Sequence, residues 1–125
     1  MPTGLHHIAL LCSDKERALR FYVDVLGFRL KRALERPERR DEIVWLEGCG
    51  ITLELFVAKD RPARVSDPEA YGLRHLALQV DDVERVAARV AALGFSPEPI
   101  RVDSVDGKKM TFVKDADGLP VELHE

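Results

Sequence analysis

The stretch "HHIALLCSDKERALRFYVDVLGF" at residues 6–28 recurs in altered form as "RHLALQVDDVERVAARVAALGF" at residues 74–95. In both copies a histidine precedes a short apolar run and a polar turn, and apolar residues then recur at helical spacing as far as Leu-Gly-Phe. The apolar run is typical of a buried strand, and the spacing after the turn is typical of an amphipathic helix. A repeat of this kind indicates that one supersecondary unit is used twice.

The repeat extends beyond the helices to two acidic residues. The segment "ITLELF" at residues 51–56 corresponds to "LPVELHE" at residues 119–125. His7 lies 47 residues before Glu54, and His75 also lies 47 residues before Glu122, so both residue types recur at an offset of 68. We therefore expect each His and Glu to occupy the same place in its own unit.

Each unit is predicted to contain a strand, a helix and three further strands. Capping boxes are expected at Ser13 with Glu16 and at Asp81 with Glu84, and a left-handed glycine is expected to end each helix. The later strands are predicted at residues 28–34, 43–47, 51–57, 98–103, 109–114 and 120–124. The sequence thus predicts a single α+β domain over residues 1–125, with a first module at 1–58, a Pro-containing linker at 59–72 and a second module at 73–125.

Segment 35–41, "ERPERRD", is predicted to be a solvated hairpin loop, and a mobile lid is the alternative. His6 falls on the opposite face of the first strand from His7 and breaks register with His75, so it is not included among the site residues. His124 shares the face of Glu122, and a frayed terminal residue is favoured over a supporting role beside that carboxylate.

The four repeated polar residues are expected on the mixed face of each sheet. In the first strand His7 shares its face with Leu11, whereas Leu10 belongs to an aliphatic face that a helix can cover. A single strand His is more often a hydrogen-bonded structural residue, and a single strand Glu is more often solvated. Two His and two Glu with equal offsets instead favour a site for one divalent transition metal, such as Ni, Zn, Co, Fe or Mn.

The charge and the apolar content of the chain give no sign of binding to nucleic acid or to a membrane. The 125 residues carry a formal net charge of −3 with both signs mixed along the chain, which gives no reason to expect nucleic acid or an anionic membrane as a partner. No apolar run approaches the roughly 20 residues of a membrane helix, and no export signal is recognisable, so we expect a cytoplasmic protein. Cys12 and Cys49 fit no metal-finger spacing and are expected to be free thiols, with no role predicted.

Over essentially its whole length the chain resembles the vicinal oxygen chelate superfamily, and within it the small bacterial glyoxalase I-like metalloproteins. The motifs that carry the resemblance are "HHIAL", "DKERALRFYVDVLGF", "LEL", "GLRHLALQVDD" and "FVKDADGLPVEL". The resemblance implies two βαβββ modules that form an open, barrel-like cleft. It also implies metal ligation by His7, Glu54, His75 and Glu122, and a homodimer in which the ligands come from one chain or from both.

The resemblance implies a lyase or isomerase that converts the hemithioacetal of a 2-oxoaldehyde into a 2-hydroxyacyl thioester. Glu122 is then the candidate catalytic base, and Glu54 is the alternative base or a second proton carrier. Leu11 replaces an arginine that helps to hold glutathione in bacterial glyoxalase I, so glutathione and another thiol both remain open as cosubstrate. The alternatives are an epimerase, an extradiol dioxygenase, an epoxide-antibiotic thiol transferase, or a non-catalytic drug-binding resistance protein.

Overall fold

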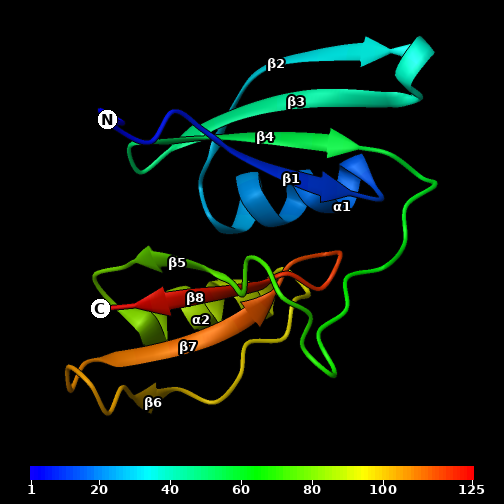
Figure 1. Ribbon diagram of the computed structural model, residues 1–125. Helices are drawn as coiled ribbons and strands as arrows, with labels where there is room; N and C mark the ends of the chain where they lie inside the picture. Colours follow the sequence, from blue (N-terminus) through cyan, green and yellow to red (C-terminus); the bar gives the residue numbers. More distant parts are fainter. The chain divides into compact units, whose positions relative to one another are not determined.

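The computed structural model describes residues 1–125, which divide into two compact units, residues 1–62 and 63–125 (Figure 1). The elements of the first unit are β1 (Ile8–Cys12), α1 (Lys15–Leu19), the π-helix η1 (Arg20–Val25), β2 (Arg29–Arg36), the 3-10 helix η2 (Pro37–Arg39), β3 (Asp41–Gly48) and β4 (Ile51–Val57). The elements of the second unit are β5 (Leu76–Gln79), α2 (Val83–Ala92), β6 (Arg101–Val102), β7 (Lys109–Lys114) and β8 (Pro120–His124). No helix of the chain has both the length and the apolar character needed to cross a membrane.

The two units have the same sheet topology. The strand order is β1-β4-β3-β2 in the first sheet and β5-β8-β7-β6 in the second. In each sheet the first strand of the unit runs parallel to the last, and the other neighbours are antiparallel. The α+β class and the repeated βαβββ order are therefore confirmed.

The helices begin one residue later than predicted. The Asp14 side chain accepts a hydrogen bond from the backbone N–H of Arg17 at 3.0 Å, and the Asp82 side chain accepts one from that of Arg85 at 2.9 Å. The predicted caps at Ser13 and Asp81 are therefore wrong, because a carboxylate stands one position closer to each helix and satisfies its free N–H groups.

The helix ends agree with the prediction. Gly27 and Gly94 have φ angles of 81° and 92°, in the left-handed region that favours glycine. The backbone N–H of Phe28 donates to the carbonyl of Tyr22 at 2.9 Å, which closes the first helix and turns the chain into β2.

Each sheet has one buried apolar face. In the first unit Leu10, Leu53 and Leu55 are buried, as are Phe21 and Tyr22 of the π-helix η1. In the second unit α2 contacts β7 and β8, whose buried residues include Val113, Val121 and Leu123. The predicted alternation is confirmed in β4, where Glu54 faces away from the buried Leu53 and Leu55. In β8 Glu122 is buried together with its neighbours Val121 and Leu123.

Strands β4, β7 and β8 have the predicted bounds, whereas β6 is much shorter than expected. Pro97 and Pro99 have no backbone N–H group and cannot donate a hydrogen bond to a neighbouring strand. Between them, the backbone N–H of Glu98 donates to the carbonyl of Phe112 in β7 at 2.8 Å. A hairpin connects β2 and β3, but it is shorter than the predicted loop at residues 35–41, because Glu35 and Arg36 belong to β2 and Asp41 begins β3. Arg36 forms two hydrogen bonds across it to Asp41 at 2.8 and 2.7 Å.

Candidate metal centre

The first unit brings His7 and Glu54 together. His7 lies immediately before β1, two residues from Ala9, which pairs with Glu54 of β4 in the parallel register. Nε2 of His7 is 3.2 Å from Oε2 of Glu54, with 38% of the His7 side chain and 15% of the Glu54 side chain exposed. The imidazole is thus open to solvent, whereas the carboxylate is largely enclosed.

The second unit repeats this arrangement with His75 and Glu122. His75 lies immediately before β5, and Glu122 lies in β8 opposite Ala77. Nε2 of His75 is 3.0 Å from Oε2 of Glu122, and the His75 ring makes an edge-to-face contact with Phe112 at a centroid distance of 5.1 Å. The sequence had predicted that both histidines lie within their strands, but each of them immediately precedes its strand.

The donor set of each pair fits a first-row transition metal. Imidazole nitrogen and carboxylate oxygen are both ligands of such ions. Two neighbouring ligands of one octahedral ion, each about 2.1 Å from it, are about 3 Å apart, which matches the separations within the His–Glu pairs. In the absence of an ion, the same separations allow an N–H···O hydrogen bond. Each unit thus offers two of the four predicted ligands.

A further side chain lies beside His7. Nδ1 of His6 is 2.8 Å from Nδ1 of His7, and the two rings are arranged edge to face at an interplanar angle of 79°. Strand alternation had placed His6 on the other face, but residue 6 lies outside β1 and does not follow that alternation. The doubled histidine in "HHIAL" was the available sequence signal.

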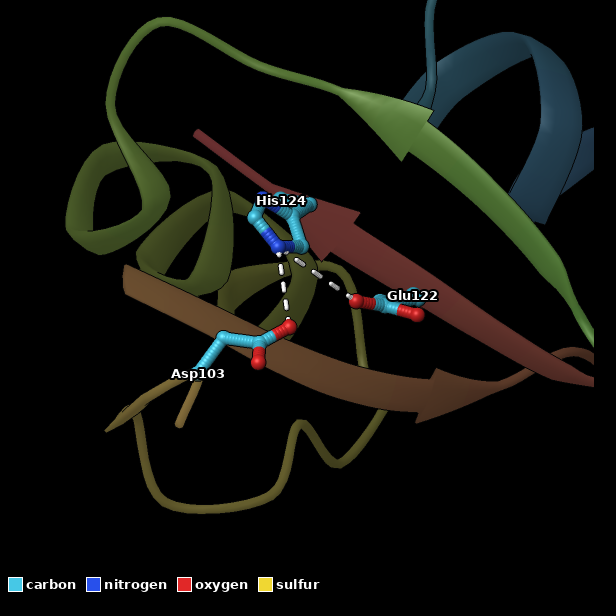
Figure 2. Close-up of side chains that lie close together, drawn as sticks. All are labelled: Asp103, Glu122 and His124. Atoms are coloured by element: carbon cyan, nitrogen blue, oxygen red, sulfur yellow. Dashed lines mark hydrogen bonds and ion pairs between the residues drawn. The ribbon is translucent and has the colours of Figure 1, made fainter. Parts of the chain in front are cut away.

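Figure 2 shows that His124 and Asp103 lie close to Glu122. The possible ligand atoms of Asp103, Glu122 and His124 all lie within 4.8 Å of one another. Nε2 of His124 is 3.2 Å from Oδ2 of Asp103, 3.1 Å from Oδ2 of Asp106 and 3.9 Å from Oε1 of Glu122. The expectation that His124 is a frayed terminal residue is wrong, because its ring is held within this group of carboxylates.

Hydrogen bonds raise the pKa of His124 in this second arrangement. Its hydrogen bond to the carbonyl of Glu125 at 2.9 Å raises the pKa of His124, and the bond to Asp103 acts in the same direction. The pKa of Asp103 is lowered, first by the hydrogen bond from the backbone N–H of Val105 and then by His124. The contacts of His124 with Asp103 and Asp106 account for this group without a metal, although the same atoms are chemically capable of holding one.

The acidic residues around the start of α2 have structural partners. Asp82 caps the helix, and Glu125 Oε1 accepts from the backbone N–H of Val83 at 3.0 Å. Glu84 accepts from Nζ of Lys109 at 2.6 Å, and this hydrogen bond lowers the pKa of Glu84. Helix capping and ion pairing thus explain this cluster.

The second unit contains a cavity of about 710 Å³ whose wall includes His75 and Phe112. Arg101 also lines it, with its guanidinium 5.4 Å from the centre of the Phe112 ring and 3.0 Å from Oε2 of Glu98. The volume falls within the range of small-molecule sites. One member of a His–Glu pair therefore borders space for a small ligand.

The sequence and the fold of this chain are similar to those of known proteins. A family model for the Glyoxalase/Bleomycin resistance protein/Dioxygenase superfamily matches residues 4–123. The uncharacterized protein YwkD of Bacillus subtilis is 43% identical over 123 residues, which cover 98% of this chain and 96% of YwkD. The lactoylglutathione lyase of Haemophilus influenzae is 31% identical, over 95% of this chain and 90% of that one. The crystal structure of the glyoxalase family protein from Enterococcus faecalis has a TM-score of 0.92 and 46% identity, and the match covers 98% of each chain.

Proposed function

The chain belongs to the Glyoxalase/Bleomycin resistance protein/Dioxygenase superfamily, and from this premise we propose that it is a divalent-metal-dependent lyase or isomerase of the glyoxalase I type. The substrate class is a hemithioacetal of a 2-oxoaldehyde, which presents two adjacent oxygens, and the product class is a 2-hydroxyacyl thioester. The similarity to the Haemophilus influenzae lactoylglutathione lyase supports this reaction class.

One observation carries the proposal. Each unit positions an imidazole Nε2 next to a carboxylate Oε2, at 3.2 Å in the first unit and 3.0 Å in the second. The same pair thus recurs with the same chemistry at a sequence offset of 68 residues. Duplicated pairs of this composition supply two neutral nitrogen donors and two anionic oxygen donors, which together neutralise one divalent cation.

In this proposal His7, Glu54, His75 and Glu122 hold the ion. A divalent ion held there supplies Lewis acidity, which favours negative charge on the adjacent substrate oxygens. The two carboxylates are the more enclosed members of the pairs, with 15% and 11% of their side chains exposed, and the imidazoles are the more open members. The enclosed carboxylates are thereby kept from full hydration, which strengthens their interactions with a cation.

Glu122 is the proposed base. Its Oε2 lies 3.0 Å from Nε2 of His75, and its Oε1 lies 3.9 Å from Nε2 of His124. The carboxylate takes the proton from the carbon that bears the hydroxyl and the thiol sulfur and returns it to the former carbonyl carbon, while the hydroxyl proton passes to the oxygen of that carbon, which yields the 2-hydroxyacyl thioester. Glu54 lacks such an imidazole, because Phe56 stands two residues after it, and it is the alternative or second proton carrier.

The cavity beside His75 supports a substrate site in the second unit. The cosubstrate thiol is proposed to be glutathione or a different small thiol. Leu11, which stands where bacterial glyoxalase I has an arginine, is 60% exposed and offers no charge to a glutathione carboxylate. Comparison of several thiols is therefore part of the test.

We also propose a homodimer. Strand β1 is an edge of its sheet, and its apolar residue Leu11 is exposed, as is Leu5 three residues before the strand. Co-expression of His7→Ala/Glu54→Gln chains with His75→Ala/Glu122→Gln chains tests how the ligands are shared. If the ligands come from two chains, the mixed dimer regains one intact site and partial activity, whereas ligands from a single chain give no recovery.

The activity test uses purified protein stripped of metal and reloaded separately with Ni²⁺, Co²⁺ or Zn²⁺. Formation of the 2-hydroxyacyl thioester from methylglyoxal and glutathione, or another thiol, is followed by its absorbance. We expect turnover that depends on the metal and falls by more than about 100-fold in Glu122→Gln, as expected for loss of a general base. Glu47→Gln, on strand β3, is the matched control and should keep its activity.

Two outcomes distinguish an error in the proposed reaction from an error in the proposed metal centre. Metal binding without thioester formation from any thiol contradicts the reaction but not the metal centre. A protein that takes up none of the three ions contradicts both and favours a metal-free binding protein.

A further inference from the structure

We propose that His6 is a positioning residue that accepts a hydrogen bond from Nδ1–H of His7 in the metal-bound protein and so holds the ring with Nε2 available to the metal. This inference rests on the proposed function, because it assigns a role to His6 only if His7 is a ligand. The observation behind it is the 2.8 Å contact between Nδ1 of His6 and Nδ1 of His7.

A contact between two imidazole nitrogens restricts the positions of the protons. A neutral imidazole carries one N–H and one bare nitrogen, and a hydrogen bond between two such rings needs one donor and one acceptor. If His7 donates, its Nδ1 carries the proton and its Nε2 is bare. If His6 donates instead, Nδ1 of His7 is the acceptor and its Nε2 carries the proton.

The position of Glu54 selects the first arrangement in the metal-bound protein. Nε2 of His7 is the nitrogen directed at the Glu54 carboxylate, 3.2 Å away, and is therefore the one that can share an ion with it. A ligating nitrogen must be bare, so Nδ1–H of His7 donates to Nδ1 of His6. His6 then carries its own proton on Nε2, on the side of its ring away from His7.

The second unit has no hydrogen bond that corresponds to the one between His6 and His7. The residue that corresponds to His6 is Arg74, whose Nε donates to Oε1 of Glu69 at 3.0 Å instead of contacting a ring nitrogen of His75. The His75 ring is instead fixed by its edge-to-face contact with Phe112. The two histidine ligands are thus oriented by different means, and substitution at position 6 should affect only His7.

The test compares His6→Leu, which removes the acceptor, with His6→Asn, whose side-chain oxygen can take the place of Nδ1. Metal affinity is measured by calorimetric titration of the stripped full-length protein with Zn²⁺ and by the visible spectrum with Co²⁺. We expect His6→Leu to weaken binding by about 10- to 100-fold, the usual effect of losing a group that orients a ligand, and His6→Asn to recover most of the affinity. Arg74→Leu is the matched control and should not weaken binding.

The tautomer is read directly from long-range ¹H–¹⁵N NMR spectra of the imidazole rings. We expect His7 to be protonated on Nδ1 and His6 on Nε2 in wild type with Zn²⁺. This signature does not depend on activity, and a general loss of packing would not produce it.

The possible failures are distinguishable. Unchanged affinity in His6→Leu, equal weakening in His6→Leu and His6→Asn, or a proton on Nε2 of His7 with metal present overturns the role of His6 and leaves the metal centre intact. Wild-type protein that binds neither ion overturns the proposed function itself. Circular dichroism and thermal unfolding of each variant confirm that an observed loss of affinity is not a loss of folding.

Discussion

Nε2 of His75 lies 3.0 Å from Oε2 of Glu122, although the two residues are 47 positions apart in the sequence. The parallel pairing of β5 with β8, in which Ala77 is opposite Glu122, brings them together. The same pairing of β1 with β4 brings His7 to Glu54. A pair of parallel neighbouring strands is therefore the structural unit that the chain uses twice to position an imidazole beside a carboxylate.

Two histidines adjoin Glu122, and substitution distinguishes their roles. We predict that His75→Ala lowers Zn²⁺ affinity by more than about 100-fold, since loss of a direct ligand costs more than loss of an outer partner. His124→Ala should lower it by less than about tenfold, because Nε2 of His124 is already engaged by Asp103 and Asp106. Calorimetric titration of both variants provides the comparison, and the reverse order of affinities would assign the ion to Asp103, Glu122 and His124.

The two faces of the first sheet should differ in their contribution to stability. Leu55 is fully buried, whereas Leu11 is 60% exposed. We predict that Leu55→Ala lowers the free energy of unfolding by about 2–5 kcal/mol through lost burial and a residual cavity. Leu11→Ala should change it by less than about 0.5 kcal/mol. Urea unfolding followed by circular dichroism measures both, and similar losses in the two variants would mean that the assignment of the faces is wrong.

The hairpin between β2 and β3 should contribute a pH-dependent part of the stability. The hydrogen bonds from Arg36 hold the pKa of Asp41 below its ordinary value of 3.8. A carboxylate with a lowered pKa in the folded state stabilises the protein above the ordinary value, and this contribution is lost as the pH falls through the lowered one.

Asp41→Asn removes that titration, so its free energy of unfolding should fall less steeply than that of wild type as the pH is lowered from about 5 to about 2. Arg36→Leu should flatten the profile in the same direction, because Asp41 then loses the partner that lowers its pKa. Parallel profiles for wild type and both variants would show that this ion pair makes no contribution.

The two thiols should differ in reactivity. Cys12 is buried in β1, Cys49 is exposed, and neither forms a disulfide, as the sequence predicted. We predict that a thiol reagent labels one cysteine in the native protein and two after unfolding, and that Cys49→Ser removes the native signal. Desolvation raises the pKa of Cys49 above its ordinary value of 9.0, so native labelling should still accelerate above pH 9, where more thiolate forms. Rapid native labelling of both thiols would contradict the burial of Cys12.

Much of the fold could be predicted because each unit contains clear local sequence patterns, namely alternating apolar residues in strands and a glycine at the end of each helix. Alternating apolar residues gave the bounds of β4, β7 and β8, and Gly27 and Gly94 gave the ends of the helices. Other boundaries depended on competition between neighbours. Asp14 and Asp82 replaced the predicted caps because two adjacent polar residues can both serve, and only the helix register decides between them.

The site was only partly predictable for a related reason. Equal offsets identified His7 with Glu54 and His75 with Glu122, because a duplicated register preserves pairs that lie on neighbouring strands. The surroundings of each pair are not duplicated. Asp103 reaches His124 from a hairpin 21 residues earlier in the chain, and His6 adopts a backbone position before β1 where strand alternation no longer applies. Such contacts depend on loop conformation, which residue spacing does not encode.

The central proposal is that His7, Glu54, His75 and Glu122 bind one divalent ion. The most direct test is X-ray diffraction from crystals of the protein loaded with Zn²⁺, with anomalous data collected on both sides of the zinc absorption edge. The account predicts one strong anomalous peak per chain in contact with all four side chains, drawn from one chain or from two. A peak bound by Asp103, Glu122 and His124 without His75, or separate peaks at the two His–Glu pairs, would contradict it.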